Sequence, residues 1–240
     1  MTSFLPSGFL LVNKPAGPTS HDIVGRLRRL TGIKKIGHAG TLDPFASGLL
    51  LCAVGREATK TINQFVKMDK EYIATIHLGA ITDTYDRTGQ VIAASADLSP
   101  EASAKGEGYV APKKEIVEKV VSEFVGEQEQ IPPMFSAKKI NGRKMYELAR
   151  QGKTVERQPC AINIYSMEVL NYDWPLLKIK IKCSSGTYIR TLAFDLGERL
   201  GCGAYVAELV RTKISHYDLT DAVDLAQIKA DNYFTFFNKT

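Results

Sequence analysis

Five stretches of the chain carry the hydrophobic pattern of β-strands. They are residues 8–12, 49–54, 72–79, 177–183 and 204–215. The first two are continuous apolar runs, typical of strands buried on both faces, and the third alternates apolar and polar residues. In the fourth, apolar residues alternate with Lys178, Lys180 and Lys182, so one face is predicted to be buried and the other cationic. In the fifth, we expect Arg211 and Lys213 to lie on the polar face.

Segments with helical periodicity lie between these strands. After a cap at Thr19 or Ser20, the apolar residues Ile23, Val24 and Leu27 fall on one face of a helix. The other predicted helices cover residues 55–65, 112–126, 145–151, 191–200, where Thr191 is the expected cap, and 221–229. At 240 residues the chain can bury one substantial core, or one domain with a smaller appendage.

Two segments lack a regular pattern. Residues 93–111 are dominated by Ala, Ser, Gly and charged residues, which favours a flexible surface loop. Residues 130–144 are irregular and basic and carry Phe135. Basic residues interleaved with an aromatic suit neutralisation of an RNA backbone and base stacking. An ordinary surface hairpin is the better interpretation of this segment taken alone.

Composition and charge exclude several classes of protein. With 44% hydrophobic and 24% charged residues, the chain is typical of a soluble globular protein, and its net charge of +5 permits an anionic partner without requiring one. The four cysteines and four histidines show no metal-ligand or redox spacing, so we expect no metal site and reduced thiols. The apolar run near the N-terminus is too short for a signal sequence or a membrane span, so a cytoplasmic protein is predicted.

Residues 37–48 concentrate the groups that suit chemistry. Three glycines, His38, Asp43 and Pro44 lie within this segment, directly before an apolar strand. Pro44 disfavours helical backbone at Asp43 and stiffens the turn, so Asp43 is predicted to lie on a loop at the rim of the core. Asp before Pro is also a common turn residue, and from this loop alone that is the more frequent role.

Four segments together resemble the four sequence motifs of the TruB family of RNA pseudouridine synthases. They are residues 8–22, 38–50, 70–72 and 183–192, in the order of the family. Ala39, Phe45 and Ser47 depart slightly from the family pattern, at positions where we expect no chemistry. The resemblance covers approximately residues 8–230.

The resemblance implies a fold, a reaction and a partner. The implied fold is the α/β (α+β type) pseudouridine synthase core, a mixed, largely antiparallel sheet flanked by helices with an RNA-binding cleft. One catalytic domain over residues 1–240 is expected, with a thumb insertion at about 126–152 that grips RNA. Bacterial members convert the uridine at position fifty-five of the tRNA T-loop to pseudouridine without cofactor or metal. A monomer that binds the T-stem-loop is expected, without the C-terminal PUA module of longer members.

The resemblance also implies roles for individual residues. Asp43 matches the catalytic carboxylate, and Arg190 matches the arginine that keeps this carboxylate ionised. Tyr72 matches the tyrosine that stacks on the flipped base and accepts its C5 proton. The remaining expected contacts to substrate are His38, which fills the space of the flipped nucleotide, Tyr188 and Leu209 around the base, and Lys14 near the active site.

Other roles are open for several of these residues, and other functions for the protein. Tyr72 and Leu209 also suit core strand positions, and Arg190 could instead pair with Asp195 or Glu198. Asp83 and Asp86, on a polar loop, suit loop capping better than a cation site. The protein could be a noncatalytic RNA-binding or RNA-folding protein on the same fold, or a synthase acting on ribosomal or messenger RNA. Intact Asp43, Tyr72 and Arg190 favour the tRNA enzyme.

Overall fold

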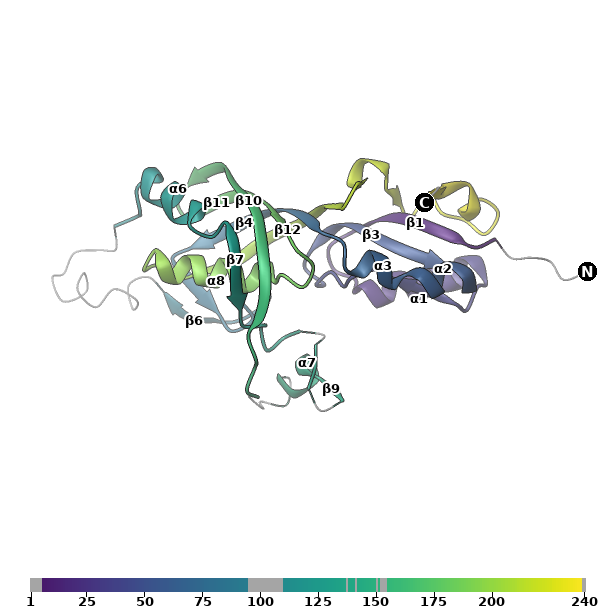
Figure 1. Ribbon diagram of the computed structural model, residues 1–240, viewed down its shortest axis with the longest axis horizontal. Helices are drawn as coiled ribbons and strands as arrows, with labels where there is room; N and C mark the ends of the chain where they lie inside the picture. Colours follow the sequence, from purple (N-terminus) through teal and green to yellow (C-terminus); the bar gives the residue numbers. More distant parts are fainter. Residues whose placement is uncertain are drawn as a thin grey trace, which may run out of the picture. The chain divides into compact units, whose positions relative to one another are not determined.

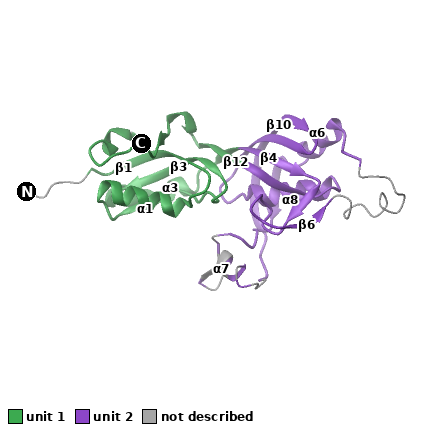
Figure 2. Cartoon of the chain, turned by 180° about the vertical axis from the view of Figure 1, so that it is seen from behind, with its two compact units in different colours: residues 1–72, 209–240 green, residues 73–208 purple. Residues whose placement is uncertain are grey.

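The chain is described here by a computed structural model (Figure 1). It describes residues 6–94, 110–136, 138–140, 142–149, 151 and 155–238. These form two compact units, coloured separately in Figure 2: unit 1 is Met1–Tyr72 with Leu209–Thr240, and unit 2 is Ile73–Glu208. Two strands, β4 (Lys70–Leu78) and β12 (Ala204–Ile214), continue along the chain from one unit into the other. The single catalytic domain stays a prediction, and most of the loop predicted at 93–111 lies outside the described residues.

Unit 1 is built around two central antiparallel strands. β1 (Gly8–Lys14) pairs with β3 (Ser47–Val54) from Gly8–Val54 to Lys14–Gly48. The short strand β2 (Ile36–His38) pairs antiparallel with β3, and β12 runs parallel to β3 on its other edge. Three two-residue strands complete the unit: β13 (Tyr217–Asp218) pairs with β12, and β14 (Val223–Asp224) and β15 (Phe237–Asn238) pair with β1. The buried runs at 8–12 and 49–54 are thus confirmed as neighbouring core strands.

Helices cover both faces of this sheet. On one face, α1 (Ser20–Thr31) buries Ile23, Val24 and Leu27 against Leu10 and Leu50. On the other face, α2 (Arg56–Thr61) and α3 (Asn63–Val66) supply buried apolar residues that pack on the alternate residues of β1 and β3. The predicted cap of α1 is confirmed at Thr19, where a capping box satisfies the first backbone N–H groups. Because both faces are covered, the continuous apolar runs of β1 and β3 are explained.

The strands of unit 2 follow the order β12-β4-β11-β10-β7, with β10 antiparallel to both of its neighbours. β10 (Cys160–Asp173) pairs with β7 (Gly126–Gln130) on one side and with β11 (Leu176–Cys183) on the other. The alternation predicted for β11 is confirmed, with Leu177, Ile179, Ile181 and Cys183 fully buried. The helices are α6 (Lys114–Ser122), which packs against β10 and α8 (Ile189–Arg199), and α7 (Met145–Ala149). Two small hairpins are β5 (Ala80–Thr82) with β6 (Val91–Ala94), and β8 (Lys139–Ile140) with β9 (Arg143–Lys144).

Several sequence-based boundaries were wrong. The helix predicted over 112–126 ends at Ser122, and β7 then begins at Gly126, whose φ of +120° lies in the region that favours glycine. β7 is Gly-Glu-Gln-Glu-Gln, which has no apolar alternation, because it lies at the edge of the sheet and forms through pairing with β10. The segment predicted as a thumb therefore starts, in the structure, with a sheet strand.

The predicted helix at 221–229 was also wrong. This region contains the 3-10 turn Leu219–Asp221 and the bridge strand β14, whose Val223 pairs with Val12. Pairing with β1 prevails over the weak helical periodicity of the sequence. No helix in the described part of the chain is long and apolar enough to cross a membrane.

Candidate active site

Asp43 lies on the loop between β2 and β3, as predicted, and the backbone around it is held on both sides. The Ser20 hydroxyl, at the start of α1, donates to Leu42 O (3.1 Å) and accepts from Leu42 N–H (2.9 Å). The Gly17 N–H donates to Pro44 O at 2.7 Å. The residues before and after Asp43 are therefore fixed by contacts from the loop and helix that follow β1. These contacts hold the backbone of the loop on both sides of Asp43.

Lys14 is a fully buried cation beneath this loop. Its ammonium donates to Ala46 O at 2.6 Å, to Pro15 O at 2.9 Å and to Pro44 O at 3.4 Å. Burial lowers the pKa of Lys14 to about 8, and the carboxylate of Asp43 acts in the opposite direction. Lys14 therefore fixes the loop after Asp43 and interacts electrostatically with it.

Arg211 is a second buried cation, and the position predicted for it from the sequence was wrong. It was expected on the polar face of its strand, yet its side chain is 1% exposed. Nε donates to Leu49 O (2.7 Å) and Nη2 donates to Gly40 O (3.2 Å), so Arg211 joins two points on either side of Asp43 in the chain. The alternation of the strand could have indicated this burial. Arg211 lies two residues after the buried Leu209, and residues two apart in a strand share a face.

A glycine lets β12 approach this loop closely. Gly48, at the start of β3, has φ of +105° and pairs with Arg211. A Cβ atom at Gly48 would lie 2.4 Å from the Arg211 carbonyl oxygen, closer than such atoms approach. Gly48 is therefore required for the parallel pairing that brings Arg211 under the loop.

The other predicted site residues of unit 1 are partly or fully buried. His38 lies on β2, where burial lowers the pKa of its imidazole and the charge of Arg211 lowers it further. Tyr72 on β4 and Leu209 on β12 are 8% and 6% exposed. The structure thus brings Lys14, Asp43 and His38 into one charged environment with Arg211. It also buries Tyr72 and Leu209.

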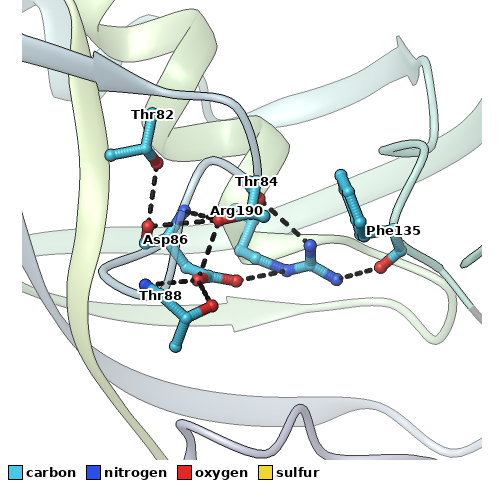
Figure 3. A network of polar contacts seen from close by, with 6 residues as sticks. All are labelled: Thr82, Thr84, Asp86, Thr88, Phe135 and Arg190. Atoms are coloured by element: carbon cyan, nitrogen blue, oxygen red, sulfur yellow. Dashed lines mark hydrogen bonds and ion pairs between the residues drawn. The ribbon is translucent and has the colours of Figure 1, made fainter. Parts of the chain in front are cut away.

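Arg190, in the first turn of α8, is held by a dense polar network in unit 2 (Figure 3). Its side chain is 3% exposed and its Nε lies 3.7 Å from the Asp86 carboxylate. Nη1 donates to Thr84 O at 3.1 Å, and Nη2 donates to Phe135 O at 2.8 Å. Arginine suits this position because its planar group donates in several fixed directions at once.

Asp86 pairs with Arg190, a contact that was not predicted from the sequence. The carboxylate accepts from the Thr88 N–H (2.9 Å), the Thr88 hydroxyl and the Thr84 hydroxyl (3.0 Å), as Figure 3 shows. Thr82 completes the turn by donating to Asp86 O at 2.8 Å. The predicted capping role is thus correct, but Asp86 is also the buried counter-ion of Arg190. The one indication of this pairing in the sequence was that Asp86 lies in a run of threonines and aspartates.

Tyr188 lies at the residue before α8, where Gln130 fixes its backbone. The Gln130 amide accepts from Tyr188 N–H at 2.7 Å and donates to Tyr188 O at 3.0 Å. The helix therefore begins at Ile189, and the predicted cap at Thr191 was wrong: the Thr191 hydroxyl instead donates to Ile131 O (3.3 Å). As a result Arg190 is a helical residue, not part of the preceding loop. The Gln130 side chain, from β7, thus fixes the backbone at the point where the helix begins.

Within the described residues, no group of three His, Cys, Asp or Glu side chains is placed to hold a metal ion. The chemistry available in unit 1 is that of one carboxylate on a fixed loop beside buried cations. In unit 2 it is that of a buried, rigidly held guanidinium. A carboxylate can act as a nucleophile or a general base, and a fixed cation can stabilise the ionised carboxylate or developing negative charge.

Known proteins resemble this chain over most of its length. Residues 28–189 match the model of the TruB family pseudouridylate synthase N-terminal domain, and residues 190–236 match that of the tRNA pseudouridylate synthase B C-terminal domain. The chain is 49% identical over 221 residues to tRNA pseudouridine synthase B of Protochlamydia amoebophila, covering 92% of this chain and 79% of that protein. It is 44% identical over 220 residues to the protein of the same name from Chlamydia felis, covering 92% and 88%.

Solved structures share the fold. The crystal structure of a Cbf5-Nop10-Gar1 complex matches with a TM-score of 0.68 and 28% identity, over 95% of this chain and 55% of that one. An H/ACA RNP bound to a substrate RNA matches with a TM-score of 0.64 and 26% identity, over 95% and 54%. The chain thus spans about half the length of these two solved chains. The predicted α/β pseudouridine synthase fold is confirmed.

Proposed function

This chain belongs to the TruB family of pseudouridine synthases, and we propose that it isomerises uridine 55 in the T-loop of tRNA to pseudouridine. The observation that carries the proposal is the position of Asp43. It lies on a loop fixed by Ser20 and by two buried cations, Lys14 and Arg211. An RNA-binding protein without catalysis has no need of a carboxylate held in this way.

The reaction breaks the N1–C1′ glycosidic bond, turns the uracil and joins C5 to C1′, after which C5 loses a proton and N1 carries one. Asp43 either attacks C1′ or abstracts a sugar proton, and both routes require the ionised carboxylate. Positive charge near a carboxylate favours its ionised form. Lys14 supplies such charge from within unit 1. We assign the same role to Arg190, which Asp86 and two backbone carbonyls hold in a fixed orientation.

The partner is RNA. Because the chain belongs to the TruB family, we propose the T-stem-loop of tRNA as its ligand. The target nucleotide has to leave the stack of the loop before Asp43 reaches it. Tyr72, Tyr188, Leu209 and His38 are the residues proposed to contact the flipped base or the space it leaves. We propose a cytoplasmic monomer that needs no metal and no cofactor. The segment after β7 is proposed as the thumb that grips the RNA stem.

Tyr72→Phe is predicted to retain stacking on the base and to lose the acceptor of the C5 proton. The ring face is unchanged, so affinity for tRNA should change little. Glycosidic cleavage should continue because that step needs Asp43, and the variant should accumulate cleaved intermediate or return it to uridine. Quench-flow analysis of a single turnover distinguishes these outcomes. Pseudouridine formation at the parent rate would remove Tyr72 from proton transfer.

Binding to tRNA is predicted to weaken steeply with salt and to depend on the basic residues of the proposed thumb. These residues are Lys138, Lys139, Arg143 and Lys144. Each phosphate contact that is lost should lower the log–log salt slope by about one unit. The measurement is tRNA affinity against salt concentration for the parent and for the fourfold alanine variant. An unchanged slope would show that these residues make no phosphate contacts.

Tritium release tests the proposed function. A tRNA transcript carrying uridine tritiated at C5 loses tritium after C5 has joined C1′, when the hydrogen on C5 is removed. The parent protein is expected to release one equivalent per tRNA, and none when cytidine replaces uridine 55. Release that persists with cytidine at this position would place the activity elsewhere in the RNA. Binding without release would favour a noncatalytic RNA-binding protein.

A further inference from the structure

The loop after β5, residues 83–88, holds Arg190 and has an unusual backbone conformation at its centre. Tyr85 has φ of 61°, and in the described part of the chain Ser215 is the only other residue besides the glycines with positive φ. This conformation costs energy for a bulky residue and persists only where its surroundings impose it. Glycine or asparagine adopts it more readily. A tyrosine at this position therefore indicates that its side chain has a role that the smaller residues could not fill.

The backbone at Tyr85 directs two neighbouring carbonyl groups to different elements. The Thr84 carbonyl accepts a hydrogen bond from Nη1 of Arg190, in α8, at 3.1 Å. The next carbonyl, that of Tyr85, accepts from the Val206 N–H of β12 at 3.0 Å, and the Arg87 N–H donates back to Val206 O at 3.0 Å. The conformation at Tyr85 thus allows one short loop to bind α8 on one side and β12 on the other.

The side chain of Tyr85 packs on the same helix that carries Arg190. Its ring stacks on that of Phe194, with centroids 4.3 Å apart and an angle of 22° between the ring planes. Phe194 follows Arg190 by four residues in α8, and residues four apart lie on one face of a helix. One face of α8 therefore contacts the 83–88 loop twice, through the guanidinium and through the Phe194 ring.

The groups that hold Arg190 lie directly before and after Tyr85 in the chain. Thr84 accepts from the guanidinium through its carbonyl, and Asp86 is its counter-ion. A change in the φ angle of Tyr85 would move these two acceptors relative to each other. The donors of a guanidinium point in fixed directions, so it cannot follow both acceptors if they separate. The orientation of Arg190 therefore depends on the backbone conformation at Tyr85.

We propose that Tyr85 is a positioning residue for the isomerisation and acts through its stack on Phe194. The stack holds the strained backbone in place and so keeps the Thr84 carbonyl and the Asp86 carboxylate where they orient Arg190. The ring carries this role, and the hydroxyl is not required for it. The inference rests on the proposed function of Arg190 in that reaction.

The test compares Tyr85→Asn with Tyr85→Phe and with the parent. Asparagine adopts positive φ more readily than tyrosine but has no ring, so the variant removes the stack without adding backbone strain. Misplacement of a catalytic group by about an ångström costs up to about a hundredfold, so we expect Tyr85→Asn to lower the single-turnover rate by at least about tenfold at unchanged tRNA affinity. Tyr85→Phe keeps the ring and should retain the parent rate. A parent-like rate in Tyr85→Asn, or an equal loss in Tyr85→Phe, would overturn the assignment.

Phe194→Leu removes the same stack from the side of the helix, because leucine is apolar and a good helix former but has no ring. This variant should also lose at least about tenfold in rate. If the two rings act as a pair, the double variant with Tyr85→Asn should lose less than the product of the two single losses. Multiplicative losses would contradict a role through the stack.

Tyr165→Asn is the matched control for Tyr85→Asn. Tyr165 is exposed and lies on β10 in unit 2, so its variant makes the same exchange outside the 83–88 loop. It should convert tRNA at the parent rate. A loss as large as that of Tyr85→Asn would show that the effect is not specific to the loop and would overturn the assignment.

Amide hydrogen exchange on the RNA-free protein separates this inference from the proposed function. Peptides covering residues 83–88 should exchange faster in Tyr85→Asn than in the parent or in Tyr85→Phe, whereas peptides from β1 and β3 should not change. Unchanged exchange over residues 83–88 would overturn the inference even if the parent converts tRNA. Conversely, a parent that binds tRNA without converting it would refute the proposed function, and the exchange result would still decide whether the Tyr85 ring holds the loop.

Discussion

Asp43→Asn is expected to abolish pseudouridine formation while tRNA affinity stays near that of the parent. The substitution preserves the shape of the side chain and removes only its charge. Asparagine cannot attack C1′ or abstract a proton at this position. Phosphate contacts supply most of the affinity for RNA, and we expect them to lie elsewhere. The measurements are single-turnover conversion of tRNA and a binding titration at one salt concentration.

Asp231→Asn is the matched control for Asp43→Asn. Asp231 is exposed and lies in unit 1, so its variant makes the same chemical change away from the loop. It should convert tRNA at the parent rate. A second readout concerns Lys14, since the carboxylate of Asp43 raises the pKa of this ammonium. In Asp43→Asn that pKa should fall further below its ordinary value, which titration by NMR measures. Turnover above background in the pure variant would exclude Asp43 as the catalyst.

Arg190→Lys is expected to lower turnover by at least about a hundredfold, although it preserves the charge. The guanidinium contacts Asp86, Thr84 O and Phe135 O in three directions from a buried position. A lysine ammonium cannot reproduce this planar arrangement, and its pKa falls when it is desolvated. Affinity for tRNA should stay near normal. The rate is measured in single turnovers beside Arg190→Ala.

Arg199→Lys controls for the same exchange on the same helix. Arg199 lies in the last turn of α8, half-exposed, over the ring of Phe124. Its variant should keep the parent rate. If Arg190→Lys were as active as the parent, charge alone would suffice at this position. Parent-like rates for both Arg190 variants would leave the predicted pairing of Arg190 with Asp43 without support.

Much of the fold followed from hydrophobic pattern. The core strands β1, β3, β4, β11 and β12 and the helix α1 with its cap at Thr19 lie where periodicity predicted them. These elements bury apolar residues at regular spacing, which a single sequence displays. β7 and β14 were missed because their formation depends on pairing with strands distant in sequence. Likewise the start of α8 depends on Gln130, which is separated from Tyr188 by an entire strand pair.

The candidate site was predicted in part. Asp43 is on the expected loop, whereas Arg190, predicted to precede the helix, lies in its first turn. Lys14 was expected near the active site, but the roles of Arg211 and Asp86 were not predicted, since an arginine or an aspartate on a polar strand face or loop usually faces solvent. Lys14, Arg211 and Asp86 are buried here because backbone carbonyls, hydroxyls and counter-ions satisfy them. These hydrogen bonds and ion pairs become visible only in the three-dimensional structure.

Position-specific mapping of pseudouridine on tRNA tests whether Asp43 of this chain isomerises uridine 55. Unmodified tRNA transcript is incubated with the parent or with Asp43→Asn, labelled with a carbodiimide that marks pseudouridine, and read by primer extension. We expect one new stop, reporting uridine 55, with the parent and none with the variant. A stop at another position only, no stop with the parent, or the same stop with Asp43→Asn would contradict it.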